Sequence, residues 1–114
     1  MRRLSWILPE AVHIPMGPGK WPRFIGGGWQ ALLNDLHGEL VRLDPACFVY
    51  EASAAEYGAL ALRFQAPPAV ATQARALVDA TVATSRKTCE QCGDRGQLYG
   101  GPWLVTLCSR CAPL

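Results

Sequence analysis

Four cysteines near the end of the chain occur in two pairs with the spacing of a metal site. They are Cys89, Cys92, Cys108 and Cys111, in the pattern C-x2-C-x15-C-x2-C. Zinc prefers four soft ligands at tetrahedral corners about 2.3 Å away, and a two-residue spacer lets one tight turn present both sulfurs of a pair to the same ion. Gly93 tolerates the positive φ that such a turn needs. We therefore expect the four cysteines to bind one structural zinc ion.

Two other interpretations of these cysteines remain open. A thioredoxin-like redox site needs one Cys-x-x-Cys at a turn from strand to helix, whereas this chain has two such pairs at ribbon spacing. Four unligated core cysteines are the second alternative. Since an all-cysteine ligand set leaves no coordination position for water, it favours a structural role over zinc-mediated hydrolysis.

The rest of the sequence offers little for catalysis. His13 and His37 are the only histidines, and neither lies near a nucleophile in the sequence. His37 falls on the polar side of a predicted helix, which is typical of a solvated side chain. Cys47 could pair with a histidine for nucleophilic catalysis, but a small buried cysteine beside a strand is the commoner outcome. We expect no enzymatic activity and keep catalysis as a lesser alternative.

Hydrophobic spacing predicts the elements that must position the cysteines. From Trp29, apolar residues recur every three or four positions, which predicts an amphipathic helix over residues 29–43. Apolar and polar residues alternate over 48–51 and 60–64, which predicts two strands of a hairpin. A second apolar stripe predicts a helix over 68–85 that leads into Cys89. Finally, residues 97–99 and 103–107 flank a Gly-Gly-Pro turn and predict a ribbon hairpin that brings the second cysteine pair back to the first.

These elements predict an α+β fold. Because a two-stranded hairpin is marginal alone, we expect both helices to pack on one face of it, with a zinc-ribbon-like four-cysteine element appended at the C-terminus. The expected divisions are a Pro/Gly-rich arm over 1–28, a helix-hairpin-helix core over 29–86 and the zinc-binding element over 87–114. A zinc site can contribute on the order of 10 kcal/mol to folding, which would stabilise a chain with a thin core.

The first 28 residues contain too many prolines and glycines for a long regular element. They also contain too many apolar residues, Trp21 and Ile25 among them, for a solvated tail. We therefore expect this arm to pack across the core or to contact a partner. The run Gly26-Gly27-Gly28 could expose amides to an anion, although a flexible hinge is the commoner role of such a run.

Composition and charge limit the functional classes. The chain is 50% hydrophobic and 18% charged, which is typical of a folded globular protein. Its formal charge of +2 assumes neutral cysteines; four thiolates and one divalent ion add −2 and bring the total near zero. Bulk charge therefore gives no argument for nucleic acid. Arg2 and Arg3 precede an apolar stretch that Pro9 ends, too short for a secretion or membrane segment, so we expect a cytoplasmic protein.

Aromatic and basic residues supply the candidate partner contacts. Tryptophans anchor protein interfaces but also fill small cores, and both roles remain open for Trp21, Trp29 and Trp103. Basic residues also gather in and beside the cysteine element. The candidate partner contacts are Trp21, Trp103, Arg86, Lys87, Arg95 and Arg110.

The sequence resembles small phage and prophage proteins whose middle reads roughly K-F/Y-G-G-L-R-F/W-Y and whose end is a cysteine-rich zinc element. In this chain Ala55 stands at the lysine of that motif, Ala59 at its second glycine, and Ala61 is interposed before Leu62. The resemblance covers about residues 26 to 111 and rests on Gly28-Trp29, Glu56-Tyr57-Gly58-Ala59-Leu60, Arg63-Phe64, Ser85, Thr88-Cys89-Glu90, Cys92-Gly93, Gly96, Trp103, Thr106-Leu107-Cys108 and Cys111.

This resemblance implies a phage accessory protein that works in the cytoplasm of a bacterial host cell. Proteins of that kind commonly bind a host protein or nucleoprotein complex stoichiometrically, for example as an anti-CRISPR protein or another inhibitor of host defence. The expected function is therefore that of a zinc-stabilised interaction protein. The alternative is a nucleic-acid-binding zinc ribbon that uses the basic residues named above.

Overall fold

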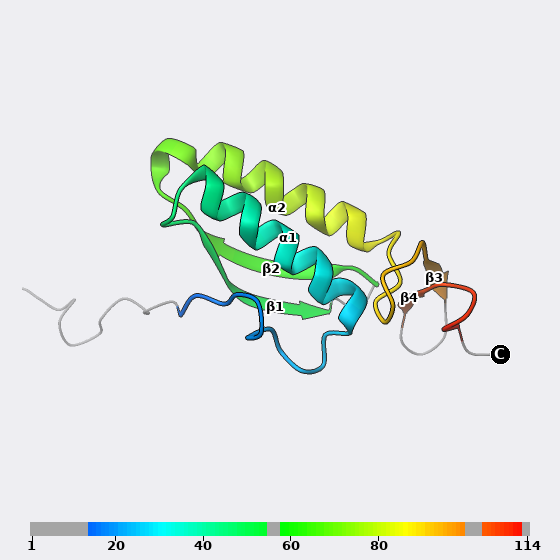
Figure 1. Ribbon diagram of the computed structural model, residues 1–114. Coiled ribbons are helices and arrows are strands. Elements are labelled where there is room, and N and C mark those ends of the chain that lie inside the picture. Colours follow the sequence, from blue (N-terminus) through cyan, green and yellow to red (C-terminus); the bar gives the residue numbers. More distant parts are fainter. Residues whose placement is uncertain (1–13, 55–57, 100–103, 113–114) are drawn as a thin grey trace, which may run out of the picture.

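The computed structural model describes residues 14–54, 58–99 and 104–112. It confirms an α+β fold with two helices, two small antiparallel hairpins and a cluster of four cysteines near the C-terminus (Figure 1). The regular elements are α1 (Gly27–Leu43), β1 (Phe48–Ala54), β2 (Leu60–Gln65), the 3-10 turn η1 (Pro68–Val70), α2 (Ala71–Ser85), β3 (Gln97–Tyr99) and β4 (Val105–Leu107).

Helix α1 presents one apolar side to the core. Trp29, Leu33, Leu36 and Leu40, spaced by four, three and four residues, are all buried. The helix begins two residues earlier than predicted and ends at Leu43, because Asp44 is extended and the following proline cannot continue the helix.

The first hairpin pairs β1 with β2 in antiparallel register. Core residues pair across it, Val49 with Phe64 and Ala52 with Leu62, with an irregularity in register between Val49 and Glu51. Strand β1 runs to Ala54, three residues beyond its predicted end. Residues 55–57 of the predicted hairpin loop lie outside the described residues.

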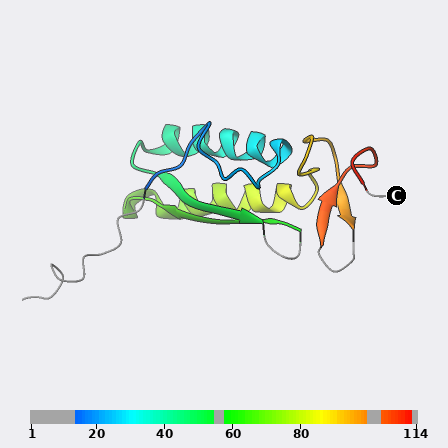
Figure 2. The same cartoon turned by 90° about the horizontal axis from the view of Figure 1, so that it is seen from below.

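Helix α2 runs antiparallel to α1, and the two helices cover one face of the hairpin (Figures 1 and 2). The segment predicted as one helix over 68–85 consists of the 3-10 turn η1 followed by α2. Apolar side chains from both helices and both strands of this hairpin form one continuous core. Within the described part of the chain, no helix is long and apolar enough to cross a membrane.

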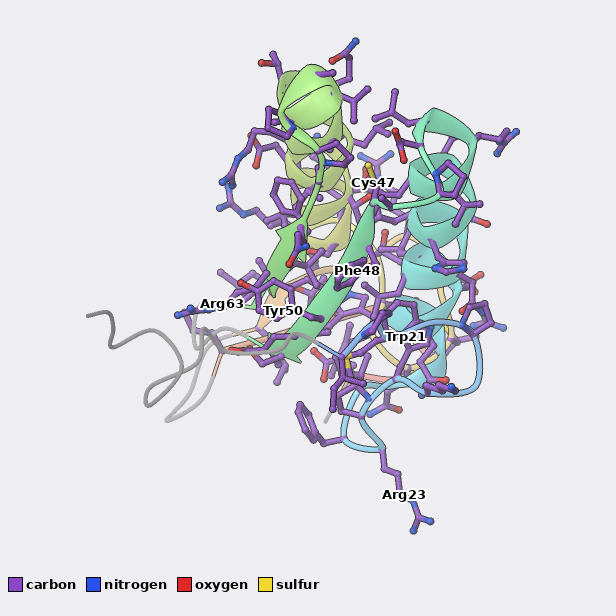
Figure 3. The ribbon with its side chains drawn as sticks, turned by 90° about the vertical axis from the view of Figure 1, so that its left-hand side faces the viewer. Trp21, Arg23, Cys47, Phe48, Tyr50 and Arg63 are labelled. Carbon is purple, nitrogen blue, oxygen red and sulfur yellow. The ribbon has the colours of Figure 1, made fainter. Side chains whose placement is uncertain are left out.

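The described part of the predicted arm packs against this core. The backbone N–H of Met16 donates to the carbonyl of Val49 over 2.8 Å, which ties the segment to the edge of β1. Trp21 is 7% exposed and Ile25 is fully buried. Figure 3 shows Trp21 lying against the body of the molecule, whereas Arg23 points away from it. Residues 1–13 lie outside the described residues.

The second hairpin pairs β3 with β4 and follows α2 closely in space (Figure 2). Gln97 lies opposite Leu107, and Tyr99 lies opposite Val105. The second strand was predicted over 103–107, and in the structure it spans Val105–Leu107. Trp103 and the predicted Gly-Gly-Pro turn lie outside the described residues.

Candidate metal centre

The four cysteine sulfurs converge on one point. All four Sγ atoms lie within 4.8 Å of one another, and those of Cys92 and Cys108 are 3.5 Å apart. A regular tetrahedron with bonds of about 2.3 Å has edges of about 3.8 Å, so this spacing fits a tetrahedral metal ion. The donor set consists of sulfur alone, which suits a soft or borderline metal. These cysteines could therefore bind a metal ion.

The first cysteine pair lies on a tight turn, here called the first knuckle (residues 89–93). The backbone N–H of Gly93 donates to the carbonyl of Cys89 over 3.0 Å, and the N–H of Cys89 donates to the carbonyl of Asp94 over 2.7 Å. Gly93 has φ of +88°, in the left-handed region that glycine tolerates best, which confirms the role predicted for it. The turn places Cys89 and Cys92 on the same side.

The second pair lies on a similar turn, the second knuckle (residues 108–112), which follows β4 directly. The N–H groups of Cys111 and Ala112 both donate to the carbonyl of Cys108, over 3.2 and 3.0 Å. The first knuckle is joined to β4 by the N–H of Glu90, which donates to the carbonyl of Thr106 over 3.0 Å. The β3–β4 hairpin therefore returns the second pair to the first, as its spacing predicted.

The protonation of the four thiols is shared. Burial raises the pKa of Cys89, but backbone N–H groups of Cys92, Cys108 and Gln91 outweigh it and lower that pKa to about 6. Hydrogen bonds from its side chain to Cys108 and Cys89 raise the pKa of Cys111 to about 12. The pKa of Cys108 is likewise lowered, because backbone N–H groups outweigh its burial, and the pKa of Cys92 is raised by its hydrogen bond to Cys108. A divalent cation could take the place of the thiol protons, because metal ligation needs thiolates.

The N-terminus of α1 packs directly on the first knuckle. The N–H of Gly28 lies 3.1 Å from the carbonyl oxygens of both Glu90 and Gln91, and the indole N–H of Trp29 donates to the carbonyl of Thr88 over 3.0 Å. A β-carbon on Gly28 would overlap the carbonyl oxygen of Cys89 and the backbone nitrogen of Gly93. Position 28 therefore requires glycine, because two backbone segments approach each other closely there. Gly28 is neither a flexible hinge nor an anion-binding site, the two roles considered for it from the sequence.

A second contact joins the β3–β4 hairpin to the core. The hydroxyl of Thr106, which is fully buried, donates to the carbonyl of Gly58 over 2.6 Å. Gly58 precedes β2 and has φ of +81°. The backbone N–H of Leu60 in turn donates to the hydroxyl of Ser85 at the end of α2, over 2.9 Å. The cysteine element (residues 87–112) is thus held against the core at two places, Gly28 and Gly58.

Comparison with protein-family models, curated proteins and solved structures found no match. The case for a metal centre consequently rests on the geometry of the four sulfurs and on the backbone that positions them. The resemblance to phage and prophage proteins stays an expectation from the sequence.

The residues predicted to contact a partner differ in how far they are exposed. Trp21 belongs to the core, and its indole N–H donates to the side-chain oxygen of Asn34 over 2.6 Å, so it offers little surface to a partner. Trp103 lies outside the described residues. The basic side chains in and beside the cysteine element are all exposed, and Arg110 forms an ion pair with Asp94; they are Arg86, Lys87, Arg95 and Arg110.

Cys47 is a buried thiol directly before β1 (Figure 3). It is not part of the cluster of four sulfurs. It is 1% exposed, and burial raises its pKa, with a smaller contribution of the same sign from the carboxylate of Asp44. A neutral, buried thiol is a poor nucleophile. His37, predicted to be solvated, is half-buried, with its ring beside Gly17.

Proposed function

We propose that Cys89, Cys92, Cys108 and Cys111 bind one structural zinc ion, and that the protein acts by binding a partner rather than by catalysis. The observation that carries the metal assignment is the convergence of four sulfur atoms within 4.8 Å. Tetrahedral sulfur sites hold zinc or iron, and zinc needs no redox partner and forms closed structural sites of this kind.

A structural role follows from the position of the site. All four coordination positions would be filled by the chain, which leaves none for a reacting water. The ion would also link the two knuckles at the place where the first of them supports α1 through Gly28. Such an ion contributes to folding free energy instead of chemistry.

The partner-binding role is supported by exposed apolar side chains next to this supported region. Phe24, just before α1, is 69% exposed, and Leu98, on β3, is 52% exposed. Large apolar side chains held on a rigid framework are common anchors of protein interfaces. Together with the sequence resemblance, they support stoichiometric binding to a host protein or nucleoprotein complex, as in an anti-CRISPR protein or another phage-encoded defence inhibitor.

A nucleic-acid-binding module is the second candidate. It is supported by the exposure of Arg86, Lys87 and Arg95 in and beside the cysteine element, because basic side chains on one part of the surface can neutralise phosphates even on a nearly neutral protein. Arg95 also lies at a polar groove of about 250 Å³ beside β3, together with Gln97 and Tyr99. Arg110, which is also exposed, forms an ion pair with Asp94.

Elemental analysis of the purified protein tests the metal assignment. We expect about one zinc per chain in the wild type and in Cys47→Ala, and loss of zinc in Cys89→Ser and Cys108→Ser. Cys47→Ala is the matched control, because it removes a buried thiol from outside the cluster. Iron in place of zinc, or full zinc content in both ligand variants, would contradict the assignment.

A pull-down from bacterial host lysate, with and without nuclease, separates the two candidates. A protein partner that survives nuclease supports the interaction protein and identifies its target. Recovery of nucleic acid that disappears with nuclease or high salt, and that falls in an Arg95→Ala/Arg110→Ala variant, supports the nucleic-acid module. Capture of neither at micromolar concentrations would overturn both.

A further inference from the structure

A groove runs along the seam between α1 and α2. It has a volume of about 290 Å³, and only helix residues line it. Its apolar part comes from Leu32 and Leu36 of α1 and from Leu77 and Ala80 of α2. The two helices are antiparallel (Figure 1). On each of them the residues that line the groove are three or four positions apart, so they lie on one side of the helix.

The charged residues that line this groove are both acidic. Asp35 and Glu39, one turn apart on α1, are exposed and lie at the groove. Glu39 is paired with Arg42 over 3.4 Å, but both side chains are more than half exposed, and such a pair contributes little and exchanges easily. The seam therefore combines an apolar floor with a negative side, a combination that matches an apolar segment carrying positive charge.

The outward surface of α2 is nearly uncharged. Its fifteen residues include only two charged ones, Arg75 and Asp79, which pair with each other over 3.9 Å. The exposed positions nearest the seam are small and neutral, among them Ala80 and Thr84. A surface helix normally carries many charged residues on its outer side, whereas the centres of interfaces are depleted of them.

We propose that this seam is the docking surface for a partner segment of one kind, an amphipathic helix. Its leucine-like side chains would lie over Leu32, Leu36 and Leu77, and lysine or arginine side chains would face Asp35 and Glu39. An amphipathic helix in a hydrophobic groove is a recurring mode of peptide recognition. This inference rests on the proposed partner-binding function and names the surface and the partner chemistry for it.

Charge argues against a second copy of this chain as the occupant. In a two-fold dimer the same surface meets itself, so Asp35 and Glu39 of both copies would be brought together. Like charges at an interface disfavour association. A basic helix carries the charge that this surface lacks.

Titration with two labelled synthetic peptides tests the proposal by fluorescence anisotropy. The basic probe has leucine at helical positions i, i+3, i+4 and i+7 with lysine elsewhere, and the control has glutamate in place of lysine. We expect the basic probe to bind and Asp35→Lys/Glu39→Lys to weaken it roughly tenfold or more. Asp79→Lys is the matched control, since it reverses an exposed charge of the same helix pair outside the groove, and it should change affinity less than about twofold.

The other outcomes overturn the proposal. Three of them concern the peptides: no binding of the basic probe, equal affinity for the two peptides, or a loss of affinity in Asp79→Lys as large as in the double variant. The fourth is concentration-dependent dimerisation of the protein that Ala80→Arg abolishes. Circular dichroism and zinc content of each variant establish that it is folded. If a pull-down partner is captured equally by wild type and Asp35→Lys/Glu39→Lys, the docking surface is wrong while the partner-binding function stands.

Discussion

Among single residues, Gly28 makes a backbone contact that excludes any side chain at its position. Its backbone N–H faces two carbonyl oxygens of the first knuckle, and there is no space for a side chain. The neighbouring Gly27 differs, because a β-carbon there would lie at an ordinary 3.5 Å from the carbonyl oxygen of Gln91. Of these two adjacent helical glycines, only Gly28 is required by a close backbone contact.

We predict that Gly28→Ala destabilises the protein by about 1–3 kcal/mol, the usual cost of forcing extra atoms into a packed site. Gly27→Ala should leave the stability within about 1 kcal/mol of wild type or raise it, because alanine favours helix and loses less entropy on folding. Urea unfolding of both variants, followed by circular dichroism, measures the difference. Equal stabilities would show that α1 does not pack on the knuckle as described.

Cys47 should react slowly in the folded protein. Burial raises its pKa, so its thiolate forms at higher pH in the folded chain than in the unfolded chain, and the thiolate is the reactive form. At pH 8 we expect alkylation of Cys47 by iodoacetamide to be roughly tenfold or more slower in native protein than in guanidinium. Peptide mass spectrometry follows that residue alone, and similar rates in the two states would disprove its burial.

At the scale of elements, the β3–β4 hairpin has too few residues to be stable alone. Each strand has three residues, and isolated two-stranded hairpins are marginal in water even when longer. The buried hydrogen bond from Thr106 to Gly58 joins this hairpin to the segment before β2. The stability of the hairpin therefore depends on its docking against the core.

Replacing Thr106 by valine tests that dependence. Thr106→Val keeps the shape of the side chain but leaves the carbonyl of Gly58 without its donor, so we expect a loss of about 1–3 kcal/mol in the free energy of unfolding. Thr72→Val, at an exposed position of α2, is the matched control and should stay within about 0.5 kcal/mol of wild type. A Thr106→Val protein as stable as the control would show that this hydrogen bond contributes little.

At the scale of the whole molecule, the cysteine element and the helical core are expected to unfold together. The first knuckle supports the start of α1, and Thr88 accepts the hydrogen bond of Trp29, whose side chain lies in the core. Unfolding of the first knuckle would therefore expose the start of α1 and the side chain of Trp29, which belongs to the core. A cysteine element that folded independently would unfold without exposing the core.

Removal of the proposed zinc ion by a strong chelator should therefore unfold both parts. Structural zinc contributes about 10 kcal/mol or more in small domains, which is comparable to the total stability of most proteins. We expect helical circular dichroism and tryptophan fluorescence to change in one transition, and added zinc to reverse it. Retention of the full helical signal after chelation would show that residues 87–112 fold separately from the core.

The sequence by itself determined the features that depend on local spacing. The two Cys-x-x-Cys pairs predicted the sulfur cluster, and apolar periodicity predicted α1, α2 and the first hairpin, because ligand turns, helices and strands repeat over a few residues. Only the tertiary structure decided the burial of Trp21, the requirement for Gly28 and the docking of Thr106 on Gly58. These depend on contacts between distant residues, such as Trp29 with Thr88, 59 positions apart, and Gly58 with Thr106, 48 positions apart. Periodicity carries no information about which distant backbones meet, so a glycine that permits such a meeting looks like a hinge until the chain is folded.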